Sequence, residues 1–421
     1  MKLIVTIHEE TPEAAIAAIG ALSLRHDVVE VRFDAFGQLP YDFRPFREAT
    51  PKPILATNRG GDHVDIARAL GAGIDLVDVE WHEGLTLDGL IDSARERIVL
   101  SHHDWNGVPE LAPLIDAMSA FGCAYTKIAV TPRTLRENEL LLDAARAGLS
   151  IFGMGERGLY SRILAPFFGS ELTFVAPDDA HVAAPGQLTL ERALAIYGDG
   201  ELPRVPKIFA IAGNPAGHSL SPSIHNPLFR ERSVAAAYTI ASFETFDEIA
   251  EAFLAQRITG LSVTAPFKED AYRFAVDAGA EIRPNAQRAE AINTLVNTPR
   301  GILAENTDFD GLLELMPSGV KRAAVIGAGG TARAAIAALK FKNATVEVFN
   351  RTPRTILGCA TKPLEEIARF DGDLIIDTLP GGVDVELPKL PAISAAYSRG
   401  GVKLLHAQAG PQHDIFLEAF K

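Results

Sequence analysis

Short apolar runs recur through the first half of the chain at a spacing of roughly 22 to 28 residues, and helical patterns fill the gaps. In the first gap, Thr11 and Pro12 supply a capping hydroxyl and a proline at the first turn. Eight strands alternating with helices predict a small (β/α)8 TIM barrel, whose sites lie at the carboxyl ends of the strands. An open doubly wound sheet is the alternative. The runs are Lys2–Ile7, Asp27–Phe33, Pro53–Thr57, Asp75–Val79, Arg97–Ser101, Tyr125–Val130, Leu149–Gly153 and Leu172–Val175.

One of these runs, Tyr125-Thr126-Lys127-Ile128-Ala129-Val130, carries a lysine within an almost wholly apolar strand. A buried ammonium costs several kcal/mol unless it is paired or gives up its proton. Lysines that lose their charge by burial are those that attack carbonyls and form Schiff bases. The other interpretation is a lysine whose stem covers apolar surface while its head reaches water.

Polar side chains gather where the predicted strands end, and this convergence favours a polar site over scattered structural roles. In the fifth run, alternation places Val99, Ser101 and His103 on one face and His102 on the other. The polar positions are Glu30, Arg32, Arg59, Asp78, Glu80 and Ser101-His102-His103-Asp104.

The repeating pattern stops at Gly198-Asp199-Gly200-Glu201-Leu202-Pro203, which predicts a short linker and a domain boundary near residue 204. A new strand, Lys207–Ala212, then leads to Ser219 and Ser221. Ser221 before Pro222 is typical of a helix start. Hydroxyls and free amides there suit a carboxylate, although capping alone also explains Ser221.

A glycine-rich turn follows the strand at Ala323–Ile326 and opens an alanine-rich helix. Gly327-Ala328-Gly329-Gly330-Thr331-Ala332 matches the G-x-G-x-x-A pattern that binds dinucleotides. A second strand, Thr345–Phe349, ends in Asn350-Arg351-Thr352-Pro353-Arg354. Arginines at that place suit the 2′-phosphate of NADP, whereas NAD binding calls for an acidic residue.

Length and composition narrow the class of protein. A chain of 421 residues with 47% hydrophobic and 22% charged residues is expected to form two or three globular domains. The net charge of −14 argues against nucleic acid binding, so small anionic substrates would need local arginines and lysines. We expect no membrane span, no signal peptide, no disulfide and no metal site, and we expect a cytoplasmic location. The sequence does not indicate an oligomeric state.

Five segments of the first half together resemble the type I 3-dehydroquinate dehydratases of the shikimate pathway. These are Glu30-Val31-Arg32-Phe33-Asp34, Ser101-His102-His103-Asp104, Thr126-Lys127-Ile128-Ala129, Ser161-Arg162-Ile163 and Ala184-Pro185-Gly186-Gln187. The resemblance implies a (β/α)8 barrel with Lys127 as the imine-forming nucleophile and His103 as the general acid/base. It implies Asp78 and Glu80 as supporting residues. The substrate contacts it implies are Glu30, Arg32, Arg59, Arg162 and Gln187.

Two places depart from that family's pattern. Val182-Ala183 stands where the family commonly has a serine, and Arg59 is followed by Gly60-Gly61-Asp62 without an obvious acidic partner. We expect weaker binding of a substrate hydroxyl, with the chemistry retained.

The second half resembles the shikimate dehydrogenases in four further segments: Gly213–Asn226, Ser262–Glu269, Ala291-Ile292-Asn293-Thr294 and Glu305-Asn306-Thr307-Asp308. The resemblance implies a catalytic pair, Lys268 and Asp308, in which the lysine passes a proton to the alkoxide. The implied substrate contacts are Ser219, Ser221, Thr264, Asn293 and Gln408. The implied NADP contacts are Gly327, Ala328, Gly329, Gly330, Ala332, Asn350, Arg351, Thr352 and Arg354.

The last third departs most from this second family. Asp377-Thr378-Leu379-Pro380-Gly381 stands where an Asn-Ala-Thr-type turn is expected, and only about two dozen residues separate it from Leu404. A further strand with a Val-Tyr-x-Pro-type loop is usual there. We therefore predict a trimmed Rossmann domain of four or five strands.

Together these interpretations predict a bifunctional enzyme that dehydrates 3-dehydroquinate to 3-dehydroshikimate and reduces the latter to shikimate with NADPH. The alternatives are an active dehydratase with a weak or inactive reductase half, and a non-catalytic sensor of pathway intermediates. The predicted domains are a barrel over 1–203, a substrate-binding domain over 204–310, a Rossmann domain over 311–402 and a returning C-terminal helix over 403–421.

Overall fold

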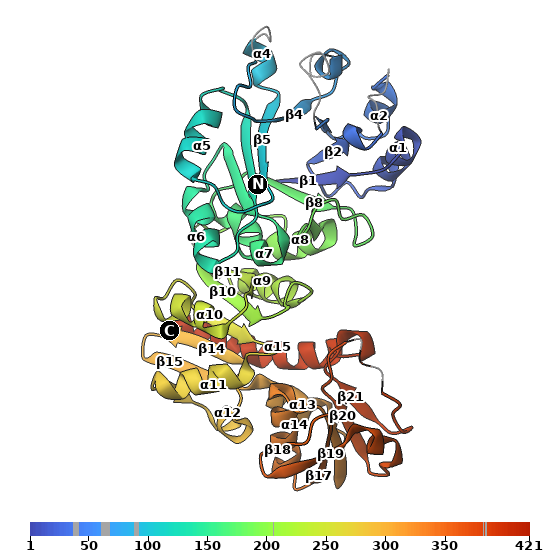
Figure 1. Cartoon of the computed structure of the whole chain (residues 1–421), viewed down its shortest axis with the longest axis vertical. Helices are drawn as coiled ribbons and strands as arrows, with labels where there is room; N and C mark the ends of the chain where they lie inside the picture. The colour runs from blue at the N-terminus through green and yellow to red at the C-terminus, as the bar shows by residue number, and fades with distance from the viewer. Residues whose placement is uncertain (37–41, 60–67, 88–91, 205, 382, 384) are drawn as a thin grey trace. The chain divides into compact units, whose positions relative to one another are not determined.

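The computed structural model describes residues 1–36, 42–59, 68–87, 92–204, 206–381, 383 and 385–421 (Figure 1). The Gly60-Gly61-Asp62 segment therefore lies outside the described residues. The chain divides into two compact units. The first comprises Met1–Pro206 and Phe229–Thr239, and the second comprises Lys207–Leu228 and Ile240–Lys421.

The first unit contains a nine-stranded parallel sheet in the order β7-β6-β5-β4-β3-β2-β1-β8-β9. Each predicted apolar run forms one strand, because strands covered on both faces need nearly continuous apolar side chains. The bounds are β1 Lys2–Ile7, β2 Val28–Arg32, β3 Ile54–Thr57, β4 Leu76–Glu80, β5 Ile98–Asp104, β6 Tyr125–Val130, β7 Leu149–Gly153, β8 Leu172–Ala176 and β9 Leu188–Thr189.

The strand order identifies a barrel type of sheet, because β8 pairs with β1 and the strands between follow in chain order. A doubly wound sheet would instead reverse its order at the first strand. No main-chain ladder joins β7 to β8 in the described part of the chain. Serine side chains bridge this seam: Ser150 Oγ accepts from Leu172 N at 2.8 Å, and Ser170 Oγ accepts from Ile151 N at 3.3 Å.

Helices follow most of these strands, and α5 and α6 lie along the outer side of the sheet (Figure 1). Helix α1 begins as predicted, with Thr11 Oγ1 accepting from Ala14 N at 3.2 Å. Helix α7 packs directly on the end of β7, since a Cβ on Gly153 would lie 2.5 Å from Gly158 Cα. The bounds are α1 Pro12–Ala21, α2 Arg44–Glu48, α4 Asp92–Arg95, α5 Leu111–Ser119, α6 Leu135–Ala144, α7 Gly155–Leu164 and α8 Leu190–Tyr197.

A six-stranded mixed sheet follows in the order β11-β10-β12-β14-β15-β13. Strand β12 runs parallel to β10, and β14 runs antiparallel to both β12 and β15. Its strands are β10 Lys207–Gly213, β11 Ala236–Ser242, β12 Gly260–Val263, β13 Glu281–Ile282, β14 Thr294–Thr298 and β15 Gly301–Glu305. Its helices are α9 Ser221–Glu231, α10 Phe246–Leu254, α11 Lys268–Asp277, α12 Pro284–Ala289 and α13 Thr307–Leu315.

The last sheet has six strands in the order β18-β19-β17-β16-β20-β21, so the predicted four or five strands are wrong. Two of the six strands, β18 and β21, have only two and three residues, too few for a periodic signal. The bounds are β16 Arg322–Ile326, β17 Thr345–Asn350, β18 Thr355–Ile356, β19 Cys359–Pro363, β20 Leu374–Asp377 and β21 Ala392–Ser394.

Two long helices accompany this sheet, α14 Gly330–Phe341 and α15 Val402–Phe416. The alanines of α14 are buried with Val325 and Ile376, which lets the helix lie close to the sheet. Short 3-10 helices complete the fold: η1 Phe33–Phe36, η2 Ala165–Phe168, η3 Leu364–Arg369, η4 Tyr397–Arg399 and η5 Leu417–Phe420. Over the described ranges, no helix is long and apolar enough to cross a membrane.

Candidate functional site

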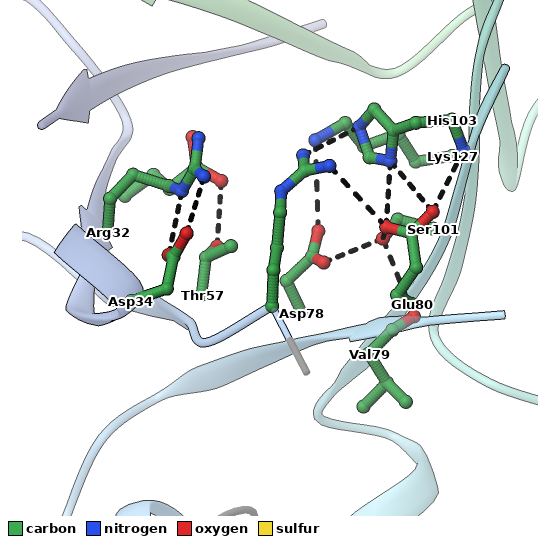
Figure 2. Close-up of polar contacts among 11 residues, drawn as sticks. Arg32, Asp34, Thr57, Asp78, Val79, Glu80, Ser101, His103 and Lys127 are labelled. Carbon is green, nitrogen blue, oxygen red and sulfur yellow. Dashed lines mark hydrogen bonds and ion pairs between the residues drawn. The ribbon is translucent and has the colours of Figure 1, made fainter. Parts of the chain in front are cut away.

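Lys127 projects from the middle of β6 into a buried environment, with only 6% of its side chain exposed. Its Nζ lies 3.7 Å from Asp78 Oδ2 (Figure 2). It also lies 3.8 Å from the centre of the Phe174 ring. Within the described residues this amine makes no hydrogen bond, and Asp78 Oδ2 is buried without one. Burial raises the pKa of Asp78 despite the nearby lysine. The amine is thus held loosely, beside a carboxyl that resists ionisation.

His103 of β5 has both ring nitrogens occupied by charged neighbours (Figure 2). Nδ1 lies 2.8 Å from Glu80 Oε2, and Nε2 lies 2.9 Å from Arg59 Nη2. Because a guanidinium can only donate, Nε2 accepts and the ring proton resides on Nδ1. Burial, aided by the charges of Lys127 and Arg59, lowers the pKa of His103 to about 4. The ring is neutral near pH 7, and its Nε2 lone pair accepts the hydrogen bond from Arg59.

Glu30 and Arg32 extend this polar cluster along β2. Glu30 accepts hydrogen bonds from Thr6 Oγ1 at 2.6 Å and Thr57 Oγ1 at 2.7 Å. Burial alone would raise its pKa, but Lys127 and these two hydroxyls bring the pKa of Glu30 below its ordinary value. Arg32 is held by a two-point hydrogen bond to Asp34, at 3.0 and 2.7 Å. Sequence analysis gave no role to Thr6, Thr57 or Asp34.

Arg162 of α7 is a buried cation without a carboxylate partner in the described part of the chain. Its Nε donates to Gly153 O at 3.0 Å, and its guanidinium lies 4.6 Å from the centre of the Phe152 ring. Burial lowers its pKa to about 10. Burying an unpaired guanidinium is costly, so the position suits an incoming anion.

Gln187 is fixed between the first and last strands of the barrel. Its Nε2 donates to Thr6 Oγ1 at 3.2 Å, and its Oε1 accepts from Ala183 N at 3.0 Å. Glu80, His103 and Arg59 are in direct contact, and Ser101 Oγ links them to the Asp78–Lys127 pair by donating to Asp78 Oδ1 at 2.6 Å and to Glu80 Oε2 at 3.2 Å. Glu30 and Gln187 meet at Thr6. Arg162 joins them only through aromatic rings, since Phe152 and Phe174 have centroids 6.4 Å apart.

The second unit holds another buried lysine, Lys268, at the first residue of α11. Its Nζ donates to Asp308 Oδ2, and Asp308 Oδ1 accepts from Asn293 Nδ2 at 3.0 Å. The same Asn293 nitrogen lies 2.9 Å from Gln408 Oε1. Four of the predicted site residues thus form one hydrogen-bonded group.

Gln412, which the sequence analysis missed, supports this group from α15. Its Nε2 donates to Asn293 O at 3.1 Å and to Thr294 Oγ1 at 2.9 Å, while its Oε1 accepts from Ser262 Oγ at 2.7 Å. Thr264 stands apart: it is half-buried, and within the described residues no hydrogen bond joins its hydroxyl to the Lys268 pair.

Ser219 and Ser221 are both buried, with their hydroxyl oxygens 3.1 Å apart. The hydroxyl of Tyr397 hydrogen-bonds the Ser219 side chain, and burial raises the pKa of this phenol. Tyr397 begins η4, directly after the short strand β21. The expectation that this chain lacks a further strand here is therefore wrong. Tyr397 follows that strand in Ala396-Tyr397-Ser398-Arg399, which is not of the Val-Tyr-x-Pro type.

The glycine-rich loop between β16 and α14 has the features that a phosphate group requires. Gly327 has φ of 103°, a conformation that favours glycine. A Cβ on Gly329 would meet nothing within 4 Å, so that position opens to space beside the first-turn amides of α14. Ala328 and Ala332 are buried. Asn350 ends β17, and Arg351, Thr352 and Arg354 beyond it are exposed.

Comparison with known families finds a matching segment in each half of the chain. Residues 3–199 match the family described as "Type I 3-dehydroquinase", and residues 211–295 match the "Shikimate dehydrogenase substrate binding domain". Each half of the chain thus contains a segment that matches one family, and the match in the second half ends at residue 295. In the 3-dehydroquinase half, the match covers every predicted site residue from Glu30 to Gln187. In the shikimate dehydrogenase half it covers Ser219 to Asn293.

Known relatives combine the same two halves. A bifunctional 3-dehydroquinate dehydratase/shikimate dehydrogenase from Arabidopsis thaliana is 29% identical over 376 residues, which cover 79% of this chain and 62% of that protein. The shikimate biosynthesis protein AroDE from Chlamydia pneumoniae is 33% identical over 303 residues, covering 68% and 62%. The chain thus spans about three fifths of these relatives' length. The dehydroquinate dehydratase and shikimate dehydrogenase structure from S. pombe AroM covers 99% of this chain and 95% of that chain, at 20% identity and a TM-score of 0.38.

Proposed function

We propose that this chain is a bifunctional enzyme of the shikimate pathway, acting on small anionic substrates. Residues 1–203 would dehydrate 3-dehydroquinate to 3-dehydroshikimate. Residues 204–310, the dinucleotide domain 311–402 and the C-terminal segment 403–421 would reduce that product to shikimate. The observation that carries the first activity is the Lys127 amine, buried and without a hydrogen bond from the described residues, close to a neutral His103. The relatives that combine both activities support the pairing.

The dehydration begins with Lys127. Its unprotonated amine would attack the ketone carbon, a carbon–nitrogen bond forms, and the ketone oxygen leaves as water; one further proton, taken up from solvent, gives the protonated imine. The imine withdraws electrons from the adjacent carbon and acidifies its proton. His103 Nε2 carries the lone pair that removes this proton, while Glu80 holds the ring from Nδ1.

The electron pair of that C–H bond then forms the new double bond, and the hydroxyl group leaves as water with the proton that His103 took up. Hydrolysis of the imine returns Lys127 and releases the enone. Arg162 would hold the substrate carboxylate, which would give its buried charge a partner. Glu30, Arg32, Arg59 and Gln187 would hold the hydroxyl groups and orient the ring.

The reduction would use Lys268 and Asp308. Bound NADPH would supply the hydride to the substrate carbonyl carbon. Lys268 would give a proton to the carbonyl oxygen as it becomes an alkoxide, and Asp308 would hold the amine in place. Ser219, Ser221 and Tyr397 form a hydroxyl cluster suited to the substrate carboxylate, and Asn293, Gln408 and Thr264 would contact its hydroxyl groups.

We assign NADP as the cofactor because Arg351 and Arg354 are exposed at the end of β17, where the 2′-phosphate would lie. The turn Gly327-Ala328-Gly329-Gly330 and buried Ala332 would receive the pyrophosphate, and Asn350 and Thr352 flank the adenosine side. Replacing Arg351 and Arg354 by alanine is expected to raise KM for NADPH about tenfold or more, with little change for NADH. Steady-state kinetics with each cofactor provides the measurement. An equal rise for both cofactors would refute the assignment.

A coupled turnover assay tests the two activities together. Purified protein receives 3-dehydroquinate with and without NADPH, and both enone absorbance and cofactor oxidation are followed. We expect enone formation without NADPH, and cofactor oxidation once NADPH is added. Enone formation with no cofactor oxidation would identify a dehydratase with an inactive reductase half. Tight ligand binding with neither signal would identify a sensor.

A further inference from the structure

The dinucleotide loop of the second unit packs directly on Lys268. A Cβ on Gly330 would lie 2.4 Å from Lys268 Cβ and 2.8 Å from its Cδ, so the lysine stem rests on the glycine backbone. A side chain at position 330 would displace the lysine as well as block a phosphate. The loop and Lys268 therefore share one packing surface.

The next residue, Thr331, makes a polar contact with the same lysine. Its Oγ1 accepts a hydrogen bond from Lys268 Nζ at 2.9 Å and lies 3.4 Å from Asp308 Oδ2. Since the ammonium has no acceptor capacity, the hydroxyl accepts from it and directs its own proton toward the carboxylate. Lys268, Asp308 and Thr331 thus each contact the other two.

An ion pair joins the same two helices at Arg333, two residues after Thr331, and Glu269, one residue after Lys268. Arg333 of α14 lies 3.2 Å from Glu269 Oε2, next to Lys268, and 3.0 Å from Glu290 Oε2. Only 15% of the Arg333 side chain is exposed. The start of α14 is thereby held against the start of α11, with the Thr331 hydroxyl facing the amine.

Dinucleotide binding explains the glycines of this loop but does not require a hydroxyl at position 331. The glycine positions let phosphates approach backbone amides, and a small apolar residue would serve equally well at 331. The threonine hydroxyl instead meets an amine whose stem already rests on the loop. Its position is best explained by what it does to Lys268.

We propose that Thr331 is a positioning residue of the reductase site: its hydroxyl fixes the Lys268 amine against Asp308 and ties this pair to the cofactor loop. The catalytic part of this proposal rests on the reductase function proposed above. The contact itself does not, and it can be tested in protein without cofactor or substrate.

The first experiment measures how accessible the Lys268 amine is. The full chain is methylated with formaldehyde and cyanoborohydride, and modification of each lysine is quantified by mass spectrometry of peptides. Thr331→Val, which keeps the shape and removes the hydroxyl, is expected to speed labelling of Lys268 at least threefold, and Thr331→Ser is expected to match the original rate. Lys340, which lies on α14 like Thr331, is the internal control. Thr345→Val, a change at an exposed position of the same domain, is the control variant.

The second experiment measures the role in catalysis. Thr331→Val is expected to lower kcat for 3-dehydroshikimate reduction about tenfold, the scale of one hydrogen bond to a charged group, with the Kd for NADPH within about twofold. Thr331→Ser is expected to restore kcat.

Unchanged Lys268 labelling in Thr331→Val would overturn the proposed contact. An unchanged kcat, or a fall in kcat matched by weaker NADPH binding, would overturn the positioning role. If the original protein oxidises no NADPH, the reductase function fails, and the labelling result still decides whether Thr331 fixes Lys268.

Discussion

Each unit buries one lysine beside an aspartate, and the two lysines are held differently. Lys127 lies 3.7 Å from Asp78 and against the Phe174 ring, without a hydrogen bond from the described residues. Lys268 donates to both Asp308 and Thr331. A nucleophile needs a lone pair that is available, and a proton donor needs a proton held in a fixed direction. The same residue type is thus suited to two reactions by the number of acceptors around it.

The two aspartates also differ in how many of their oxygens are hydrogen-bonded. Asp78 is buried with one oxygen unpaired, and burial raises its pKa. Asp308 has both oxygens engaged, one by Lys268 and the other by Asn293. A carboxyl that resists ionisation does little to retain a proton on its neighbour, whereas a carboxylate with both oxygens held by hydrogen bonds fixes the amine beside it.

The largest effect is expected from Lys127→Met. Removing the proposed covalent nucleophile should lower dehydratase kcat by at least about 10⁴-fold, because methionine has no amine to form the imine. Reductase turnover with 3-dehydroshikimate should stay within about twofold. Dehydratase turnover that survives this change would show that Lys127 is not the nucleophile.

Lys268→Met makes the same substitution in the other unit. Reductase kcat should fall about 10²- to 10⁴-fold, the range for loss of a general acid, and dehydration of 3-dehydroquinate should be unaffected. Separate assays of the two half-reactions provide the measurement. Loss of both activities in either variant would mean that the two sites are not independent.

A smaller effect concerns the stability of the dehydratase unit. The pKa of His103 is lowered to about 4 in the folded chain and stands near 6.5 when unfolded. Between these values the unfolded state binds a proton that the folded state does not, so His103 lowers stability as the pH falls from about 6.5 to 4, by up to about 3 kcal/mol.

The free energy of unfolding, measured with urea at pH 7 and pH 4.5, tests whether His103 lowers stability as the pH falls. His103→Asn should flatten the pH dependence relative to the original chain. Asp78, whose pKa is raised, is present in both proteins and cancels in the difference. An unchanged pH dependence would mean that His103 is protonated in the folded state.

Sequence analysis was most successful where local pattern and fold agree. The run Tyr125–Val130 is β6 to the residue, because a buried parallel strand must be continuously apolar, and a lysine within it is conspicuous. The strand-end positions of Glu80 and His103 could be predicted to converge, since a barrel brings parallel strand ends together. The structure places Glu80 Oε2 2.8 Å from His103 Nδ1.

Contacts between helices distant in the sequence could not be predicted in this way. Nothing in the pattern around Thr331 indicates that its hydroxyl meets Lys268, because helix packing brings these residues together. Tyr397 was missed because β21, which positions it, has three residues and no periodicity. Arg162 was expected at a carboxylate, but only the structure shows it buried without an acidic partner among the described residues.

The most direct test of the account is to trap the imine on Lys127. The protein is mixed with 3-dehydroquinate, reduced with borohydride, digested with trypsin and analysed by mass spectrometry. A reduced adduct would block cleavage after Lys127 and appear on the peptide 98–133. The account predicts that this peptide carries the ligand mass and that Lys127→Met carries none. An unmodified Lys127, or an adduct on another lysine, would contradict it.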